Sequence, residues 1–236
     1  MANEFFRFKQ FTIHQELCAM KVGTDGVLLG SWVDISKASA ILDIGTGTGL
    51  VAIMLAQRTD AAIDAIDIDQ GACIQATENI IHSPWKGKIA VHHSSLQLYA
   101  DKAQKTYDLI VTNPPYFENS LKTPDEQRNF ARHNDSLSIT DILRGVDKLL
   151  SSQGRFVIIL PYIEAQLLIV EAAMHHLYCN KKLVIKTLPT KKPSRITMEF
   201  NRTREKLVED VLSIYDSESM YTEDYKNLTK DYYLNF

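Results

Sequence analysis

The segment Ala40–Ala56 has the sequence AILDIGTGTGLVAIMLA, and it decides the fold. A strand-like run comes first, three glycines (Gly45, Gly47 and Gly49) alternate with threonines, and an apolar helical run follows. Glycine lets the backbone turn tightly and approach a ligand without a β-carbon in the way. A strand, a glycine turn and a helix in this order predict the opening unit of a parallel α/β sheet, with a ligand crevice at the turn.

Short β-branched runs alternate with helical patterns from this segment onward, which is typical of a parallel sheet built from βαβ units. We expect further strands at 62–68, 88–93, 107–112 and 154–160, and helices near 70–81, 139–150 and 162–176. Two last strands, near 182–188 and 194–201, are joined by so few residues that they must pair antiparallel. The sequence therefore predicts an α/β fold, a mostly parallel sheet that ends in an antiparallel hairpin and carries helices on both faces.

The composition is that of an ordinary globular protein, with 236 residues of which 45% are hydrophobic and 23% charged. No apolar run reaches the roughly 18 residues that span a membrane, and the first residues lack the pattern of a signal peptide. The three cysteines are odd in number and lack metal-like spacing. We therefore expect one cytoplasmic domain (1–236), a monomer with reduced cysteines, no metal and no membrane contact.

The charge is unevenly distributed along the chain, although the net charge is only −3. Residues 181–206 hold nine Lys and Arg against two Glu, which gives this stretch +7. Residues 1–180 and 207–236 each sum to −5. A basic stretch in an acidic protein suits a polyanion that is touched at one place, and a solvated hairpin is an equally good account of that stretch taken alone.

Acidic residues flank the glycine turn. Asp43 stands two residues ahead of Gly45, where it would repel a pyrophosphate but can face an ammonium or sulfonium group. Asp67 ends the second strand, where a carboxylate can accept both hydroxyl protons of a ribose. Asp69 is the alternative for that role, but it fits better as the cap of the next helix. The spacing G-x-G-x-G also differs from the dinucleotide fingerprint G-x-G-x-x-G.

A second motif, Asn113-Pro114-Pro115-Tyr116, follows the fourth strand, across the switch point from the glycine turn. Two consecutive prolines remove two backbone donors and hold the chain extended, which aims the Asn113 side-chain oxygen and the Pro114 carbonyl into the crevice. Two such acceptors can hold the hydrogens of a planar amino group and stabilise the positive charge that develops on its nitrogen during a transfer reaction. Tyr116 can stack on the target plane. These four residues are the predicted catalytic group.

The glycine turn behind Asp43 resembles the methionine-binding loop of S-adenosylmethionine-dependent methyltransferases. The strand order resembles the class I methyltransferase fold, a Rossmann-like variant with seven strands, over about residues 38–205. Residues 1–37 and 206–236 are then an N-terminal appendage and a C-terminal tail packed on that catalytic core. The resemblance implies S-adenosyl-L-methionine as the cofactor and S-adenosyl-L-homocysteine as its product.

The flanking segments resemble one family more closely. The asparagine-proline-proline-tyrosine motif occurs both in adenine 6-amino methyltransferases of nucleic acids and in glutamine methyltransferases of release factors. Residues 11–33, 131–138 and 221–234 resemble the bacterial enzymes that methylate adenine-37 of a valine tRNA. A glutamine methyltransferase normally carries a helical domain ahead of its core, for which 37 residues are too few. A non-catalytic module that binds cofactor and docks to RNA would have no use for the acceptor pair at Asn113 and Pro114.

The resemblance also implies further cofactor residues. The segment at Lys21, Gly23, Thr24 and Asp25 would lie near the methionine end, although a helix cap accounts equally well for Thr24 and Asp25. The loop after the third strand supplies the adenine pocket in this fold, which implies Ser95 or Leu96. The complete predicted cofactor set is Lys21, Gly23, Thr24, Asp43, Gly45, Gly47, Gly49, Asp67, Ile68, Ser95, Leu96 and Asn113.

The predicted RNA contacts rest on topology. Segments 117–137 and 189–193 follow the carboxyl ends of strands parallel to the first one, so both emerge on the crevice side. Their cations suit phosphates around an adenine extruded from the anticodon loop of a tRNA. The predicted set is Tyr116, Phe117, Lys122, Arg128, Arg132, His133, Lys191, Lys192 and Arg195.

Overall fold

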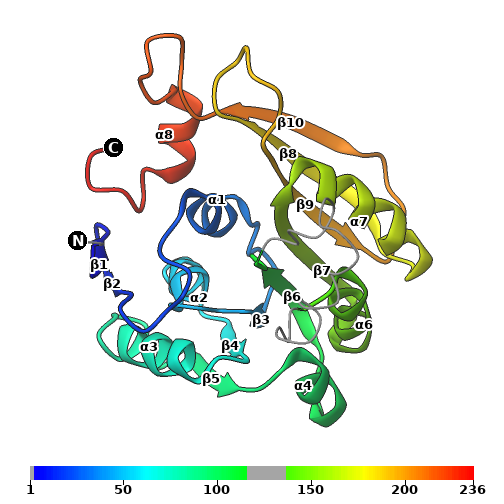
Figure 1. The fold of residues 1–236 in the computed structure, drawn as a ribbon. Helices are drawn as coiled ribbons and strands as arrows, with labels where there is room; N and C mark the ends of the chain where they lie inside the picture. The colour runs from blue at the N-terminus through cyan, green and yellow to red at the C-terminus, as the bar shows by residue number, and fades with distance from the viewer. Residues whose placement is uncertain (1–2, 116–136) are drawn as a thin grey trace, which may run out of the picture.

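The computed structural model of the protein describes residues 3–115 and 137–236. Its centre is one large sheet (Figure 1). The strands of this sheet are β3 (Ala40–Ile44), β4 (Ala62–Asp67), β5 (Ile89–His93), β6 (Tyr107–Thr112), β7 (Leu150–Pro161), β8 (Tyr178–Lys186), β9 (Arg195–Asn201) and β10 (Val208–Ser213). Within the described residues they pair in the order β10-β8-β9-β7-β6-β3-β4-β5.

The pairing directions confirm the predicted α/β class. Strand β3 lies between β4 and β6 and pairs parallel with both. Strand β9 pairs antiparallel with β7 and with β8, as the short connection before it requires. The structure adds an eighth strand, β10, to the seven that the sequence predicts, and β10 pairs parallel with β8 at the sheet edge. Its sequence signal is weak because Leu212 is its one buried side chain.

Helices cover both faces of the sheet (Figure 1). On one face lie α1 (Thr24–Trp32), α2 (Leu50–Ala56) and α3 (Gln70–Ile81), and on the other lie α4 (Leu96–Lys102), α6 (Ile139–Leu149) and α7 (Tyr162–Met174). Side chains alternate along each strand, so Ile41 packs into the first layer and Leu42 into the second. The core is thus two hydrophobic layers with the sheet between them.

Helix α1 falls in the stretch 1–37 that the sequence analysis treats as an appendage. Its Val27, Leu28 and Leu29 are fully buried and join the same hydrophobic layer as α2. The amphipathic pattern that predicts a surface helix is missing because the helix is buried nearly all round. This segment is therefore part of the core in space, although it precedes the predicted core in sequence.

The two ends of the chain meet beside α1 and α2 (Figure 1). A hairpin of β1 (Phe5–Arg7) and β2 (Thr12–His14) packs on the tail that carries α8 (Glu223–Thr229). The Tyr232 hydroxyl donates to the carbonyl oxygen of Met54 at the end of α2, at 3.0 Å. The tail thereby stabilises the C-terminal end of α2, the helix that follows the glycine turn. In the described part of the chain, no helix has the length and apolar character needed to cross a membrane.

Candidate functional site

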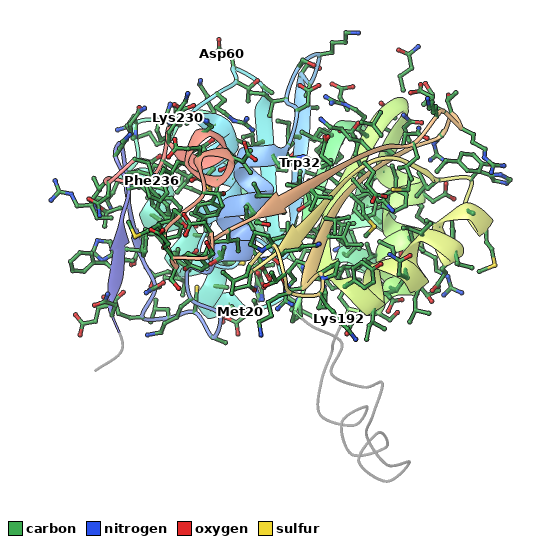
Figure 2. The ribbon with its side chains drawn as sticks, turned by 90° about the horizontal axis from the view of Figure 1, so that it is seen from above. Met20, Trp32, Asp60, Lys192, Lys230 and Phe236 are labelled. Carbon is green, nitrogen blue, oxygen red and sulfur yellow. The ribbon has the colours of Figure 1, made fainter. Side chains whose placement is uncertain are left out.

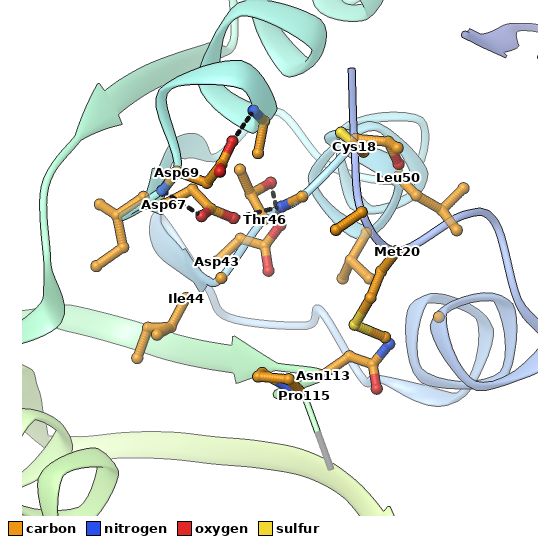
Figure 3. Close-up of a pocket in the computed structure, with 18 of the residues that line it drawn as sticks. Cys18, Met20, Asp43, Ile44, Thr46, Leu50, Asp67, Asp69, Asn113 and Pro115 are labelled. Carbon is orange, nitrogen blue, oxygen red and sulfur yellow. Dashed lines mark hydrogen bonds between the residues drawn. The ribbon is translucent and has the colours of Figure 1, made fainter. Parts of the chain in front are cut away.

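A cavity of about 530 Å³ opens at the carboxyl ends of β3, β4 and β6 (Figure 3). Cavities of this size hold small-molecule ligands. Residues of five segments line it: 18–26, 43–48 with 50 and 51, 66–69 with 72, 94–97, and 113 with 115 after β6. Leu137 and Arg195 complete the wall. The glycine turn and the Asn113 motif, which are far apart in sequence, therefore face one space, as the sequence analysis expects.

The glycine turn forms an open cradle. Gly45, Gly47 and Gly49 all have positive φ, at 68°, 55° and 80°, a backbone region in which a side chain is strained. A β-carbon added at Gly45 or Gly47 would meet nothing within 4 Å and would project into free space, whereas one at Gly49 would touch Ala76 of α3 at 3.4 Å. The first two glycines leave room for a ligand, and the third lets α2 approach α3.

Asp43 is the buried acid of the site, with 1% of its surface exposed. The Thr46 hydroxyl donates to its carboxylate at 2.7 Å. Burial raises the pKa of the Asp43 carboxyl to about 7, and the neighbouring Asp67 charge adds to the rise, against the opposite effect of hydrogen bonds from Thr46 and from the backbone of Ala52. A cationic ligand group beside Asp43 would favour its ionised form.

Asp67 and Asp69 were the two candidates for binding the ribose hydroxyls, and the structure gives them different surroundings. The Asp69 side chain accepts from the Ala72 amide at 2.7 Å and caps α3, which confirms the capping interpretation. The Asp67 carboxylate accepts from the Gly47 amide at 2.8 Å and from the Asp69 amide at 3.0 Å. Each of its oxygens keeps a further lone pair for a ligand hydroxyl. Ile68 lines the cavity beside it and is 48% exposed.

Asn113 stands at the other end of the cavity. The Thr112 hydroxyl donates to the Ile44 carbonyl at 2.8 Å, which ties the end of β6 to the end of β3 and fixes where the motif begins. The Asn113 Oδ1 atom is buried and has no hydrogen-bond partner among the described residues. A buried acceptor without a partner costs free energy, so this atom is suited to a donor on a ligand. Pro115 also lines the cavity, and Pro114 is buried behind it.

The segment 18–26 forms the wall opposite the sheet. Gly23 caps α1 and makes no side-chain cap bond, so the alternative that Thr24 or Asp25 caps this helix is wrong; both lie in its first turn. Asp25 and Arg195 form an ion pair at 2.9 Å. Lys21 is exposed, and its ammonium lies 3.5 Å from the Asn3 carbonyl.

The loop after β5 borders the cavity as well. Ser95 accepts from the Leu98 amide and caps α4, and Leu96 is 3% exposed and packs inward. Both residues nonetheless line the cavity with Ser94 and Gln97. The sequence analysis placed a loop here, because the seven residues of α4 are too short for a clear helical period.

The predicted RNA contacts are only partly within the described residues. Lys191 and Lys192 are exposed in the connection between β8 and β9, and Figure 2 shows Lys192 on the same side of the molecule as the cavity residue Met20. Arg195 lines the cavity itself. The other predicted contacts lie outside the described residues: Tyr116, Phe117, Lys122, Arg128, Arg132 and His133.

Sequence reasoning missed several wall residues, among them Cys18, Met20 and Leu137. Their side chains carry no distinctive chemistry, and no spacing rule brings them to the cavity. Over residues 3–115 and 137–236, no cluster of three or more His, Cys, Asp or Glu could hold a metal ion. Taken together, the cavity offers acids to a polar ligand at one end and an amide acceptor to an amino group at the other.

Comparison with known proteins identifies close relatives. The family model described as "Methyltransferase small domain" matches residues 18–162. The tRNA1(Val) (adenine(37)-N6)-methyltransferase of Bacteroides thetaiotaomicron is 47% identical and covers 100% of this chain and 99% of its own length. The enzyme of the same name from Trichodesmium erythraeum is 47% identical over 100% of both chains, and that of Histophilus somni is 42% identical over 98% of both.

Solved structures with lower identity share the fold. A predicted O-methyltransferase from Agrobacterium tumefaciens superposes with a TM-score of 0.71 at 17% identity, covering 88% of this chain and 96% of the other. A ribosomal protein L11 methylase from Lactobacillus delbrueckii superposes with a TM-score of 0.54 at 21% identity, over 76% and 78% of the two chains. These similarities confirm the predicted class I methyltransferase fold.

The raised pKa of Asp43 predicts a distinct pH dependence of stability. Because the folded-state pKa of about 7 exceeds 3.8, the ordinary pKa of an aspartate carboxyl, folding takes up a proton between these values. The resulting stabilisation is present at low pH and is lost as the pH rises through 7. From pH 5 to pH 8 the ligand-free protein should lose roughly 2.5 kcal/mol of unfolding free energy from this group.

Asp43→Asn removes this titration and leaves the other groups in place. The difference in unfolding free energy between the variant and the unaltered protein, measured by urea titration, should therefore grow in favour of the variant between pH 5 and pH 8. A difference that stays constant with pH would show that Asp43 ionises with an ordinary pKa.

Proposed function

The chain belongs to the tRNA1(Val) (adenine(37)-N6)-methyltransferase family, and we propose that it transfers a methyl group from S-adenosylmethionine to the 6-amino nitrogen of adenine-37 in a valine tRNA. The observation that carries this proposal is the buried Oδ1 of Asn113, which has no hydrogen-bond partner among the described residues and belongs to a residue that lines the same cavity as the glycine turn. An exocyclic amine supplies an N–H donor for such an acceptor.

The residues of the cavity fit the cofactor. The open backbone at Gly45 and Gly47 admits the methionine part of the cofactor. The buried Asp43 carboxylate, when ionised, provides a negative charge next to this turn for the ammonium or sulfonium group of the cofactor. Asp67 accepts the ribose hydroxyls with its remaining lone pairs. Ile68 and Leu96 provide apolar surface for the adenine ring of the cofactor, and Ser95 provides backbone groups that can form hydrogen bonds with it. Bound there, the cofactor supplies an activated methyl group on a sulfonium.

The target amine is held by the protein's own acceptors. Its lone pair is delocalised into the adenine ring, so it is a poor nucleophile. Asn113 Oδ1 and the Pro114 carbonyl accept its two hydrogens, favour a pyramidal nitrogen and stabilise the positive charge that develops during transfer. The Thr112 bond to Ile44 keeps these acceptors at a fixed distance from the glycine turn. Orientation of the two reactants then contributes much of the rate.

We propose that the tRNA reaches the cavity from the side on which Figure 2 shows Lys192, which is next to the exposed Lys191 in the chain. Adenine must leave its stack to enter the cavity, and a loop base does so at low cost. Cations around the opening neutralise the phosphates on either side of the extruded base. We propose the same role for Lys122, Arg128 and Arg132 of the segment that follows Tyr116, with Tyr116 stacking on the base.

We further propose that the chain works as one domain and as a monomer. Val27 of α1 and Tyr225 and Tyr232 of the tail belong to the hydrophobic layer that also holds α2. The segments on either side of residues 38–205 are therefore needed for the same core.

The decisive experiment is methyl transfer to tRNA. The purified protein is incubated with radiolabelled cofactor and total tRNA from cells that lack this modification, and the tRNA is then digested to nucleosides. We expect the label in N6-methyladenosine, and only in the digest of the valine tRNA when single tRNAs are separated before digestion. Label on a release factor added as a competing acceptor, with none on tRNA, would favour a glutamine methyltransferase. Cofactor binding without label on either acceptor would favour a non-catalytic module.

The two halves of the cavity can be separated by substitution. Asn113→Ala should lower the rate of transfer at saturating substrate at least about 100-fold, because one preorganised acceptor is lost, while the dissociation constant of the cofactor stays within about twofold. Asp67→Ala should instead weaken cofactor binding by about 10-fold or more. Calorimetric titration and single-turnover rates measure the two effects. Undiminished turnover by Asn113→Ala would exclude the proposed mechanism.

The basic connection should act through phosphates. The double variant Lys191→Ala/Lys192→Ala should bind tRNA more weakly and lower the slope of log affinity against log salt by about 1 to 1.5. The matched control is Lys86→Ala/Lys230→Ala, which removes the same charge from exposed positions; Figure 2 shows Lys230 on the side away from Lys192. If both double variants keep the original slope, the connection does not touch RNA.

A further inference from the structure

One wall of the cavity has no regular structure. Residues 15–23, here called the strap, form neither helix nor strand, yet residues 18–23 of the strap line the cavity beside the glycine turn. In Figure 3 the Met20 side chain points from the strap toward Asn113. A segment without a backbone ladder needs specific bonds to keep one shape, because fixing each residue costs about 1–2 kcal/mol of conformational entropy.

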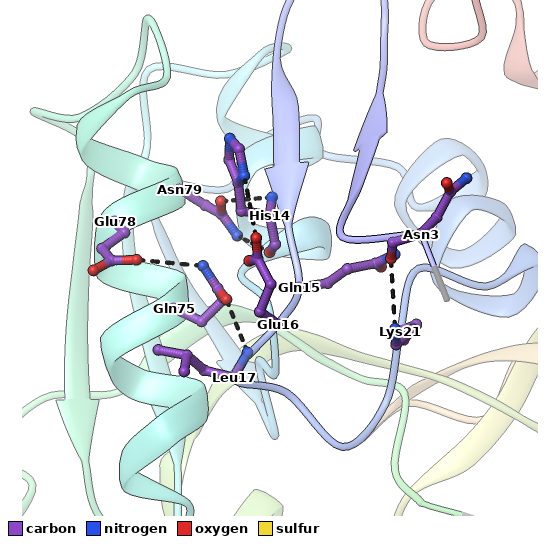
Figure 4. Close-up of polar contacts among 9 residues, drawn as sticks. All are labelled: Asn3, His14, Gln15, Glu16, Leu17, Lys21, Gln75, Glu78 and Asn79. Atoms are coloured by element: carbon purple, nitrogen blue, oxygen red, sulfur yellow. Dashed lines mark hydrogen bonds and ion pairs between the residues drawn. The ribbon is translucent and has the colours of Figure 1, made fainter. Parts of the chain in front are cut away.

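Gln15 closes the strap on itself. Its side-chain Oε1 accepts from the Val22 amide at 2.8 Å. Its Nε2 donates at 2.8 Å to the carbonyl of Asn3, and Figure 4 shows Gln15 beside Asn3. The side chain is 4% exposed. The residues between Gln15 and Val22 thus form a loop whose two ends are joined by one buried amide.

Gln75 fastens the middle of this loop to α3. Its Oε1 accepts from the Leu17 amide at 3.1 Å, and the residue is 1% exposed. One helical turn earlier, Gly71 lets the strap come close, since a β-carbon there would lie 3.1 Å from the Leu17 carbonyl oxygen. The strap therefore lies directly on the first turns of α3.

Asn79 joins His14, the residue just before the strap, to the glycine turn. Its Oδ1 accepts from the His14 amide at 2.9 Å, and its Nδ2 donates to the His14 carbonyl at 2.8 Å and to the Thr48 carbonyl at 2.9 Å. Thr48 lines the cavity, and His14 leads into the strap. One side chain, 1% exposed, thus connects the start of the strap to a residue of the glycine turn that lines the cavity.

These amides lie on a separate face of α3. Ala72, Ala76 and Ile80 pack toward the sheet, whereas Gln75 and Asn79, four residues apart, point together toward the chain at 14–17 (Figure 4). Burying a side-chain amide is unfavourable unless its polar atoms are bonded. An apolar residue would fill either position without that requirement, so the backbone bonds account for the amides.

We propose that Gln75 and Asn79, with Gln15, are positioning residues for the cofactor: they hold the strap at a fixed distance from the glycine turn and so set the width of the cavity at its methionine end. This inference rests on the proposed function for the identity of the ligand. The residues touch the walls, not the reacting groups, so their removal should act first on cofactor affinity.

The test compares Asn79→Ala with Asn180→Ala. Asn180 is a matched control: it is 6% exposed and also makes three hydrogen bonds, to Asn201, Thr203 and Glu205, at the opposite end of the sheet from the cavity. Both substitutions should lower the melting temperature by similar amounts. Only Asn79→Ala should raise the calorimetric dissociation constant of S-adenosylmethionine, by 10-fold or more.

A second variant covers the case in which Asn79→Ala does not fold. Gln75→Ala removes the acceptor for the Leu17 amide and should weaken cofactor binding at least threefold. Equal affinities in Asn79→Ala and Asn180→Ala, or in Gln75→Ala and the unaltered protein, would overturn the inference. Failure of the unaltered protein to bind S-adenosylmethionine would instead contradict the proposed function.

Discussion

The site depends on the parallel register of three strands. Ile44 at the end of β3 pairs with Ile66 of β4 on one side and with Thr112 of β6 on the other. Each chain leaves the sheet at the same edge, so the glycine turn, the acid at 67 and the Asn113 motif must converge. A one-residue slip in either pairing would turn the side chains after the strand to the other face. The chemistry of the cavity is in this sense a consequence of backbone hydrogen bonds.

The two acids near the glycine turn show how burial assigns roles. Asp43 is buried, and its pKa is raised to about 7, so the protein accepts a destabilising group at neutral pH where a neutral residue would be more stable. Asp67, one strand away, lies at the cavity surface and accepts two backbone amides. The first acid responds to the charge of what enters the cavity, and the second both shapes the turn and remains open to hydroxyl groups.

Much of the core could be predicted from the sequence because its signals are local. The β-branched runs predicted β3, β4 and β6 closely, and the glycines required the positive φ that the turn adopts. The antiparallel hairpin followed from a short connection. Helix α1 escaped prediction because burial all round erases its period, and β10 because it is an exposed edge strand. Both are defined by tertiary contacts that no window of sequence contains.

The walls of the cavity also differ in how far they could be predicted from the sequence. The wall at Asn113 is fixed by the proline rings of Pro114 and Pro115, which restrict the backbone that follows β6. The glycine turn is held by the hydrogen bonds of β3 to its neighbouring strands and by hydrogen bonds from the Gly45 and Thr46 amides to the Ile66 carbonyl, at 2.9 and 3.0 Å. Each of these two walls corresponds to a recognisable motif in the sequence. The strap is held by the side-chain amides of Gln15 and Gln75, and the residue before it is held by that of Asn79. These residues form no recognisable motif, because the sequence alone does not distinguish a buried side-chain amide from an exposed one. Each such bond contributes only about 1 kcal/mol net, so several must act together to keep the third wall in place.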